Sequence, residues 1–263
     1  MIGTALSLAT LTGAVASESS AQTFIGRQTP ALNSDRMTPE ALWAMGRIGS
    51  VQANAAGTRA VYAVTYYSVP ENKSHSVLYL LDLKTKQSQR LTTSTHSESG
   101  AVWINVGNEE QIAYLSAESG SNQLWVMSAD GSHRRQISHE ADDVQDFLFS
   151  PDSKRVILVK EVEQNTSIAP KEKDLPKATG MVINDLMYKH WDQYVTSAPH
   201  PFLADFDGTK VTVDVDLLEG EPFESPMMPF GGNEQLAWSP DSRQIAYTCR
   251  KKVGRDYATS TRQ

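Results

Sequence analysis

One eight-residue turn occurs twice in this chain and decides what the chain can fold into. The copies are residues 149–156 (FSPDSKRV) and residues 238–245 (WSPDSRQI). In each, an aromatic residue ends a strand, the proline presets φ for the second position of a type I turn, and the Asp and Ser side chains can bond to the local backbone. A β-branched, alternating strand then begins. The chain therefore repeats a β-hairpin, which indicates a repeat architecture.

A second hairpin follows the first in each unit. Strand-like runs turn at residues 84–86, at Asp130-Gly131 and at Asp207-Gly208, and Asp-Gly pairs are strong hairpin signals. The second strands of the first hairpins begin at Ala60, Ile112, Val156 and Ile245. Two hairpins make four strands, and four strands in about 45 residues describe a propeller blade. The sequence thus predicts an all-β fold, a partial β-propeller of about three and a half four-stranded blades.

Two segments stand outside this hairpin repeat. Residues 160–201 form an insertion between the two hairpins of the third blade. Its charged, proline-containing first half is expected to be exposed, and its aromatic second half is expected to pack. A short N-terminal helix is predicted after Thr38, which suits the N-cap, with Pro39 at the first helical position and Gly46 closing the helix.

The N-terminus has the pattern of an export signal. Residues 2–16 are apolar and small but too few to span a bilayer as a helix, and Ala14-Val15-Ala16 fits the A-x-A cleavage pattern. The first positive side chain is Arg27, so the basic n-region is missing. Either the true start lies upstream or the segment is not a signal, and the first interpretation is favoured. A periplasmic or secreted location is therefore expected, with no membrane span after signal removal.

The expected domain organisation follows from these signals. Residues 1–21 form the signal peptide, with its atypical n-region, and residues 22–37 form a polar linker. Residues 38–263 form the incomplete β-propeller, which includes the insertion at 160–201.

Composition and motifs argue against several kinds of site. The net charge is −7 and no Lys/Arg run forms a basic stripe, so nucleic-acid binding is not expected. His139-Glu140 begins like a zinc-protease motif, but Asp143 stands where the second histidine belongs. The acidic clusters lack the glycine bend and closing glutamate of a calcium loop. No metal, cofactor or catalytic residue is therefore predicted.

Three features together resemble a known family: the Met37-Thr38-Pro39-Glu40 opening, the Ser-Pro-Asp-Ser turns and the Lys189-His190-Trp191-Asp192 segment. Over about residues 37–257, the chain resembles the N-terminal β-propeller of prolyl-oligopeptidase-type serine peptidases, and above all the bacterial exported dipeptidyl- and acylaminoacyl-peptidase-like enzymes. The resemblance implies a following α/β-hydrolase domain with a Gly-x-Ser-x-Gly nucleophile elbow. The sequence contains no such elbow, so no catalytic residue is carried over.

The aromatic half of the insertion is the one candidate substrate site. It contains His190, Trp191, Asp192 and Tyr194. These side chains either pack the insertion against its blade or, as the resemblance implies, line the cavity between propeller and hydrolase and help to position a peptide. Both interpretations remain open at this stage.

The expected function is that of a propeller fragment of a serine peptidase that hydrolyses short peptides. The resemblance implies that the propeller gates substrate access in the full-length enzyme, is non-catalytic alone, and meets peptide substrates through a missing C-terminal hydrolase domain. The alternative is a periplasmic TolB-like propeller that acts as a protein-interaction module. A Gly-x-Ser-x-Gly elbow downstream in the same frame would distinguish the two.

Overall fold

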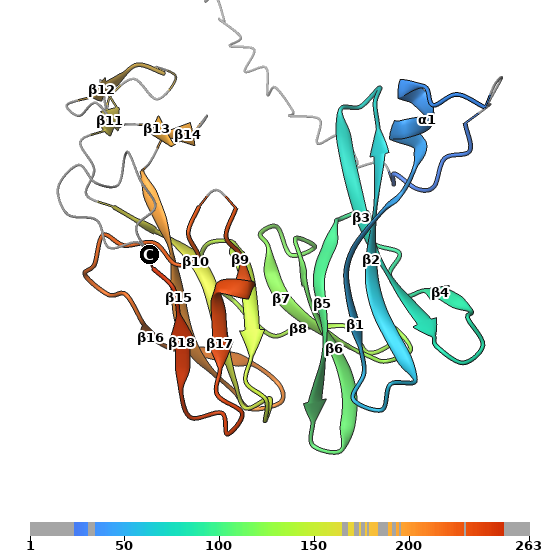
Figure 1. The fold of residues 1–263 in the computed structure, drawn as a ribbon. Coiled ribbons are helices and arrows are strands. Elements are labelled where there is room, and N and C mark those ends of the chain that lie inside the picture. The colour runs from blue at the N-terminus through green and yellow to red at the C-terminus, as the bar shows by residue number, and fades with distance from the viewer. Residues whose placement is uncertain are drawn as a thin grey trace, which may run out of the picture.

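The blades predicted from the repeated turns are present in the computed structural model. The model describes residues 24–30, 35–164, 168–170, 174, 177, 179–183, 189–190, 193–194, 196–228 and 230–249. Within these ranges, three four-stranded antiparallel sheets stand side by side and a two-stranded sheet follows them (Figure 1). The prediction of a partial propeller, with three blades and the first hairpin of a fourth, is confirmed.

The strands follow the order of the chain. Blade 1 contains β1 (Arg47–Ala53), β2 (Arg59–Ser68), β3 (Lys73–Asp82) and β4 (Ser88–Arg90). Blade 2 contains β5 (Glu98–Val106), β6 (Glu109–Ser116), β7 (Gln123–Ser128) and β8 (Arg135–Gln136). Blade 3 contains β9 (Val144–Phe149), β10 (Arg155–Glu163), β15 (Ser197–Phe206) and β16 (Val211–Asp216). After the 3-10 helix η1 (Asn233–Gln235), β17 (Leu236–Trp238) and β18 (Ile245–Tyr247) form the last hairpin.

The insertion rises from the end of the β10–β15 pair. It contains two small hairpins, β11 (Ile168–Pro170) with β12 (Met181–Ile183) and β13 (Lys189–His190) with β14 (Gln193–Tyr194). The blade 3 ladder continues as far as the pair Glu163 and Ser197, so both ends of the 160–201 segment belong to the blade. The two small hairpins lie beyond the same edge of the blades as the helix α1 (Pro39–Ala44) (Figure 1).

Each repeated turn is stabilised by its own hydrogen bonds, and a further hydrogen bond joins the two turns. The Ser150 hydroxyl donates to Asp152 Oδ1 (2.6 Å), which also accepts from the Lys154 amide (3.1 Å), and the second copy makes both bonds at the same distances. Ser153 and Ser242 take the left-handed conformation, with φ of 55° and 60°. The Ser242 hydroxyl also accepts from the Asp152 amide (3.1 Å), so the turns of neighbouring blades are joined.

An arginine–tryptophan contact closes the seams between blades 1 and 2 and between blade 3 and the last hairpin. Arg59 lies 5.1 Å from the ring centroid of Trp103, and the indole donates to the carbonyl of Gln52 (3.1 Å). Arg155 and Trp238 repeat this arrangement at 5.3 Å, with an indole–carbonyl bond of 3.0 Å. At the seam between blades 2 and 3 the register places glutamine and phenylalanine in these two positions, namely Gln111 and Phe149.

Trp103→Phe is expected to lower the free energy of unfolding by about 1–2 kcal/mol, because it removes the indole–carbonyl bond and weakens the cation–π contact. Trp125→Phe is the matched control, because the Trp125 indole nitrogen is buried without a hydrogen-bond partner. Urea unfolding of both variants measures the difference. Equal losses would contradict a specific role for the arginine–tryptophan contact.

The buried core lies between the blades rather than within them. Blades 2 and 3 enclose one apolar cluster, built around Leu124, Phe147 and Leu158. Blades 1 and 2 enclose another, built around Leu78 and Ile112. Each blade therefore has two apolar faces and is stabilised by its neighbours, as expected for a repeat fold.

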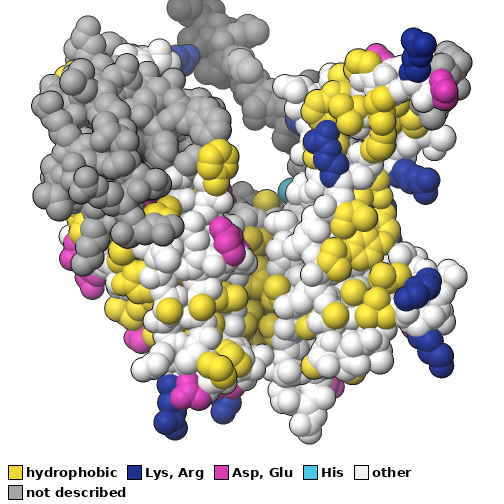
Figure 2. Space-filling view, viewed as in Figure 1, with side chains coloured by type: hydrophobic (Ala, Val, Ile, Leu, Met, Phe, Trp, Pro, Cys, Tyr) yellow, Lys and Arg dark blue, Asp and Glu magenta, His cyan; other side chains and the backbone are white. Residues whose placement is uncertain are grey.

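Blade 1 has an apolar face on the side away from blade 2. The register places Ile48 opposite Val64 and Val51 opposite Tyr62, on the face where Tyr62 and Tyr79 stack. Ile48 and Val51 are 68% and 61% exposed. Figure 2 shows hydrophobic side chains gathered over this blade and over α1. We call this surface, formed by Ile48, Val51, Tyr62 and Tyr79, the free face of blade 1.

The predicted N-terminal helix is confirmed, but it ends differently. The Thr38 hydroxyl accepts from the Ala41 amide (3.2 Å), and Pro39 occupies the first helical position. Met45, in an extended conformation, ends the helix, so the expectation that Gly46 closes it is wrong. Glycine at position 46 allows a close approach instead, because a Cβ there would lie 2.8 Å from side-chain atoms of Tyr66 and Val64.

Part of the segment expected to be a linker packs on blade 1. Ile25 is buried against Val64, Tyr66 and Val77, and the Gln28 amide donates to a backbone carbonyl of β2 (2.8 Å). Residues 24–30 therefore contribute to the blade 1 core. Among the described residues, no helix is long and apolar enough to cross a membrane.

Candidate functional site

The structure brings part of the predicted substrate site together at the backbone level. His190 and Tyr194 belong to the paired strands β13 and β14, in which Lys189 pairs with Tyr194 and His190 with Gln193. Trp191 and Asp192 lie outside the described residues. The cavity role of these four residues stays a prediction, because it depends on the side chains.

A buried histidine–aspartate pair stands at the base of the insertion. The His200 Nδ1 lies 2.8 Å from Asp216 Oδ2, and the His200 Nε2 lies 3.4 Å from the side-chain nitrogen of Gln164. Beside this pair, the Gln164 amide donates to the Thr196 carbonyl (2.9 Å), which joins the two ends of the insertion. Among the described residues, these hydrogen bonds join His200 to Gln164 and Asp216 and not to a serine, so the pair links the base of the insertion to β16.

A serine, a histidine and an aspartate also meet in the turn between β7 and β8. The Ser132 hydroxyl lies 2.6 Å from Asp130 Oδ1 and 2.8 Å from His133 Nδ1. The carboxylate contacts the serine and not the histidine, so it cannot orient the imidazole as a base. The Asp130 pKa is held below its usual range by the hydrogen bonds from Ser132, as expected for a turn carboxylate.

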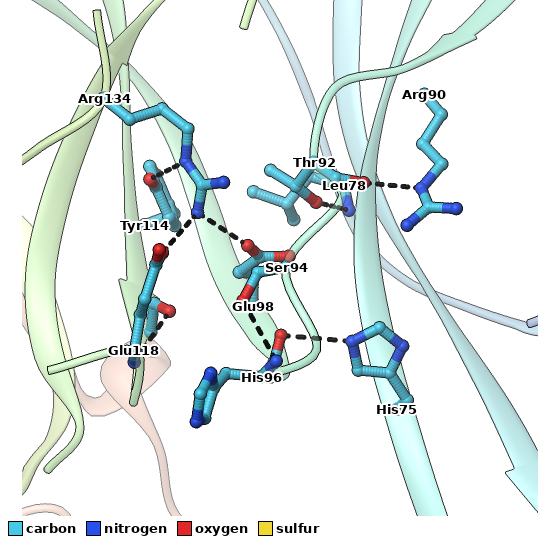
Figure 3. Close-up of polar contacts among 11 residues, drawn as sticks. His75, Leu78, Arg90, Thr92, Ser94, His96, Glu98, Tyr114, Glu118 and Arg134 are labelled. Atoms are coloured by element: carbon cyan, nitrogen blue, oxygen red, sulfur yellow. Dashed lines mark hydrogen bonds and ion pairs between the residues drawn. The ribbon is translucent and has the colours of Figure 1, made fainter. Parts of the chain in front are cut away.

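The most unusual polar centre lies under the linker that joins blade 1 to blade 2 (Figure 3). Glu98, at the start of β5, has a fully buried side chain. Its Oε1 accepts from Arg134 (2.8 Å), and its Oε2 has no hydrogen-bond partner. The same guanidinium bonds to the Tyr114 hydroxyl (3.0 Å) and to Glu118 (2.9 Å), whose side chain is 42% exposed. One arginine thus links a buried carboxylate to a solvated one.

This environment shifts the ionisation of the buried groups. Burial raises the pKa of Glu98 to about 7, although a hydrogen bond from Thr92 and the charge of Arg134 oppose the shift. Burial also raises the pKa of Tyr114, so its hydroxyl is uncharged at neutral pH. Glu98 therefore changes charge near neutrality, which marks the centre as a candidate functional feature.

Further polar contacts fasten the same linker. The Thr92 hydroxyl accepts from the Leu78 amide (3.0 Å), and Arg90 donates to the Thr92 carbonyl. The His96 carbonyl faces the Nε2 of His75 (3.1 Å), on β3 (Figure 3). The Leu91 amide also donates to the Leu78 carbonyl (2.8 Å), and the Ser97 hydroxyl accepts from the Ser76 amide (3.1 Å). The linker is therefore tied to blade 1 along its length and to blade 2 through Glu98.

The sequence analysis did not single out Glu98 or His75. One signal was available, because the pairing register aligns Glu98 with Val144 of blade 3 and with Ile48 of blade 1. A carboxylate at a repeat position that is otherwise aliphatic indicates a special role. No such signal existed for His75, since its partners come from distant parts of the chain.

No group of three or more metal-ligating side chains occurs among the residues the structure describes. The sequence motif at His139 also has no second histidine at the required spacing.

Comparison with known sequences gives close relatives over most of this chain. It is 39% identical over 227 residues to dipeptidyl-peptidase 5 of Porphyromonas gingivalis. The matched region covers 86% of this chain and 33% of that protein. It is 37% identical over 228 residues to dipeptidyl-peptidase 5 of Porphyromonas endodontalis, with 87% and 33% covered. The chain thus spans about a third of the length of these relatives. No protein-family model matches it.

Comparison with solved structures gives matches at low identity. Acylaminoacyl peptidase of Pyrococcus horikoshii matches with a TM-score of 0.46 and 13% identity, covering 66% of this chain and 25% of that one. TolB of Acinetobacter baumannii matches with a TM-score of 0.37 and 12% identity, covering 78% and 56%. The blades of this chain and its dipeptidyl-peptidase relatives identify it as a β-propeller region of the prolyl-oligopeptidase-type serine peptidase family.

Proposed function

We propose that this chain is the propeller part of an exported serine peptidase that hydrolyses short peptides. The observation that carries the proposal is the 39% identity, over 86% of this chain, to a dipeptidyl-peptidase 5 of which the matched residues make up only 33%. In the full-length enzyme the propeller restricts access to the catalytic site and admits short peptides. The chain alone does not catalyse hydrolysis, since nothing in its sequence activates a nucleophile.

The insertion is the part of the propeller that we assign to substrate positioning. Its small hairpins extend beyond the same edge of the blades as α1 (Figure 1). His190, Trp191, Asp192 and Tyr194 would line the path of the peptide there. The proposed location is the periplasm or the exterior of the cell, which agrees with the signal-like pattern of residues 2–16.

A fluorophosphonate probe, which labels active serine hydrolases, tests the proposal. The native protein, recognised in extracts of its own cells by an antibody against this chain, should be much longer than the chain, as this relative is, and should take the label. The purified 263-residue chain should take no label and should not hydrolyse dipeptidyl or acyl-aminoacyl chromogenic substrates. A native protein no longer than this chain and unlabelled would contradict the peptidase proposal and favour an interaction module.

A further inference from the structure

A cavity opens between the helix α1 and the tip of the β2–β3 hairpin. Its volume is about 350 Å³, within the range of sites that hold small ligands. Trp43 of α1 contributes one wall, and the end of β2, the turn and the start of β3 contribute the rest. The polar residues of the lining are Ser68, Asn72, Lys73 and Ser74. We call this cavity the α1 pocket.

Two aromatic rings form a rigid side of the α1 pocket. The rings of Trp43 and Tyr67 meet edge-to-face, with centroids 5.2 Å apart. The Arg47 guanidinium lies 5.0 Å from the Trp43 centroid and 4.5 Å from the Tyr67 centroid, so one cation holds both rings. The Tyr67 carbonyl also accepts from the Gln28 side chain (2.8 Å). This side of the pocket is therefore in place before a ligand arrives, which lowers the entropic cost of binding.

The positive charge at the α1 pocket has no anionic partner. In the part of the chain that the structure describes, no ion pair involves Lys73 or Arg47. Glu40 and Glu71, the acidic residues nearest to the lining in sequence, do not line the pocket. The pocket therefore presents a net positive charge and suits an anion.

The combination of groups suits a carboxylate that is attached to an apolar group. A lysine ammonium pairs with a carboxylate through charge-assisted hydrogen bonds, and the amide of an asparagine such as Asn72 can donate a further one. Aromatic rings offer a packing surface for an apolar side chain close to that charge. A peptide carries both features wherever a free C-terminus or an acidic side chain adjoins an apolar residue.

The position of the α1 pocket in the fold also suits a peptide. The helix α1 lies beyond the same edge of the blades as the two small hairpins of the insertion, to which we assign peptide positioning (Figure 1). We propose that the α1 pocket binds the carboxylate of a peptide, with Lys73 as the ion-pair partner and the rings of Trp43 and Tyr67 as the surface for the adjoining apolar side chain. This inference rests on the proposed function, because it takes the ligand to be a peptide.

Equilibrium dialysis of the purified chain against radiolabelled, acetylated tripeptides measures this binding. The three ligands are acetyl-Ala-Ala-Leu with a free C-terminal carboxylate, the same peptide amidated, and amidated acetyl-Ala-Glu-Leu. At least one of the two carboxylate-bearing peptides should bind about tenfold more tightly than the uncharged peptide, the factor expected for one charge-assisted hydrogen bond. The peptide that does so identifies the source of the carboxylate, a chain terminus or an acidic side chain.

Three variants separate the contributions of charge and apolar contact. Lys73→Gln should remove the tenfold advantage and leave the binding of the uncharged peptide unchanged. Lys84→Gln is the matched control, because Lys84 is also exposed but lies beyond the other end of β3, and it should bind like the wild type. Trp43→Ala should weaken the binding of all three peptides by a similar factor, since it removes packing surface and no charge. Trp43 is 40% exposed, so this variant should still fold.

Two results would overturn the proposal. The first, which needs no variant, is that none of the peptides binds or that all three bind equally. The second is a carboxylate advantage that survives in Lys73→Gln. These measurements involve no hydrolysis, so a failure of the α1 pocket is seen separately from a failure of the proposed peptidase function, which the fluorophosphonate probe reports.

Discussion

Glu98→Gln should remove roughly 3 kcal/mol from the pH dependence of the free energy of unfolding between about pH 4.5 and pH 8. The pKa of Glu98 is raised from 4.5 to about 7 in the folded chain, chiefly by burial. The folded state therefore binds the proton more tightly than the unfolded state does. The stabilisation from the protonated carboxyl is complete below about pH 4.5 and is lost as the pH rises through about 7. Glutamine keeps the shape of the side chain without the charge.

Urea unfolding at a series of pH values measures this effect. Glu118→Gln is the matched control, because Glu118 binds the same arginine but its side chain is 42% exposed. Its contribution should be small, as for other solvated ion pairs, at most about 1 kcal/mol. If Glu98→Gln leaves the pH dependence unchanged, or if the wild-type chain gains stability through Glu98 as the pH rises, the assignment of a buried, proton-binding carboxyl is wrong.

The second large effect is expected in the association of the isolated chain. The free face of blade 1 presents Ile48 and Val51, both more than half exposed, beside the stacked rings of Tyr62 and Tyr79. The corresponding faces between the other blades are buried in the core. An apolar face that is left uncovered favours self-association. The purified 263-residue chain should therefore form oligomers or aggregates of marginal stability.

Size-exclusion chromatography with light scattering, combined with a hydrophobe-binding dye, measures this association. The double variant Ile48→Lys and Val51→Lys should shift the chain toward the monomer and reduce dye binding. Val69→Lys is the control, because Val69 is 62% exposed but lies in the turn after β2, away from the free face. A wild-type chain that is monomeric, unfolds cooperatively and binds no dye would show that the free face does not cause self-association.

The blades could be predicted from the sequence because their signals are local. The two Ser-Pro-Asp-Ser turns and the Asp-Gly pairs each specify a hairpin within a few residues, and the register of β10 with β9 follows from them. The end of α1 was not predictable, because Gly46 is required by the approach of Tyr66 across the blade. Local propensity carries no information on such a distant contact.

The polar centre under the linker was hidden for a related reason. Glu98 and Arg134 are far apart in sequence, and their pairing depends on how blade 2 folds back on itself. The buried His75 meets the carbonyls of Ile25 and His96, and no side-chain pattern reveals these contacts. The candidate substrate site had the opposite character, since its aromatic residues were evident from the sequence itself.

The order of the strands also has a consequence for how the chain folds during synthesis. Blades 1 and 2 each use four consecutive strands, so each can be completed soon after its last strand leaves the ribosome. Blade 3 is different, because β10 must wait for β15 while all residues between Glu163 and Ser197 are made. During that interval the outer edge of β10 is an unpaired strand edge, which invites incorrect pairing. The insertion therefore makes blade 3 the slow and vulnerable step in the folding of this propeller.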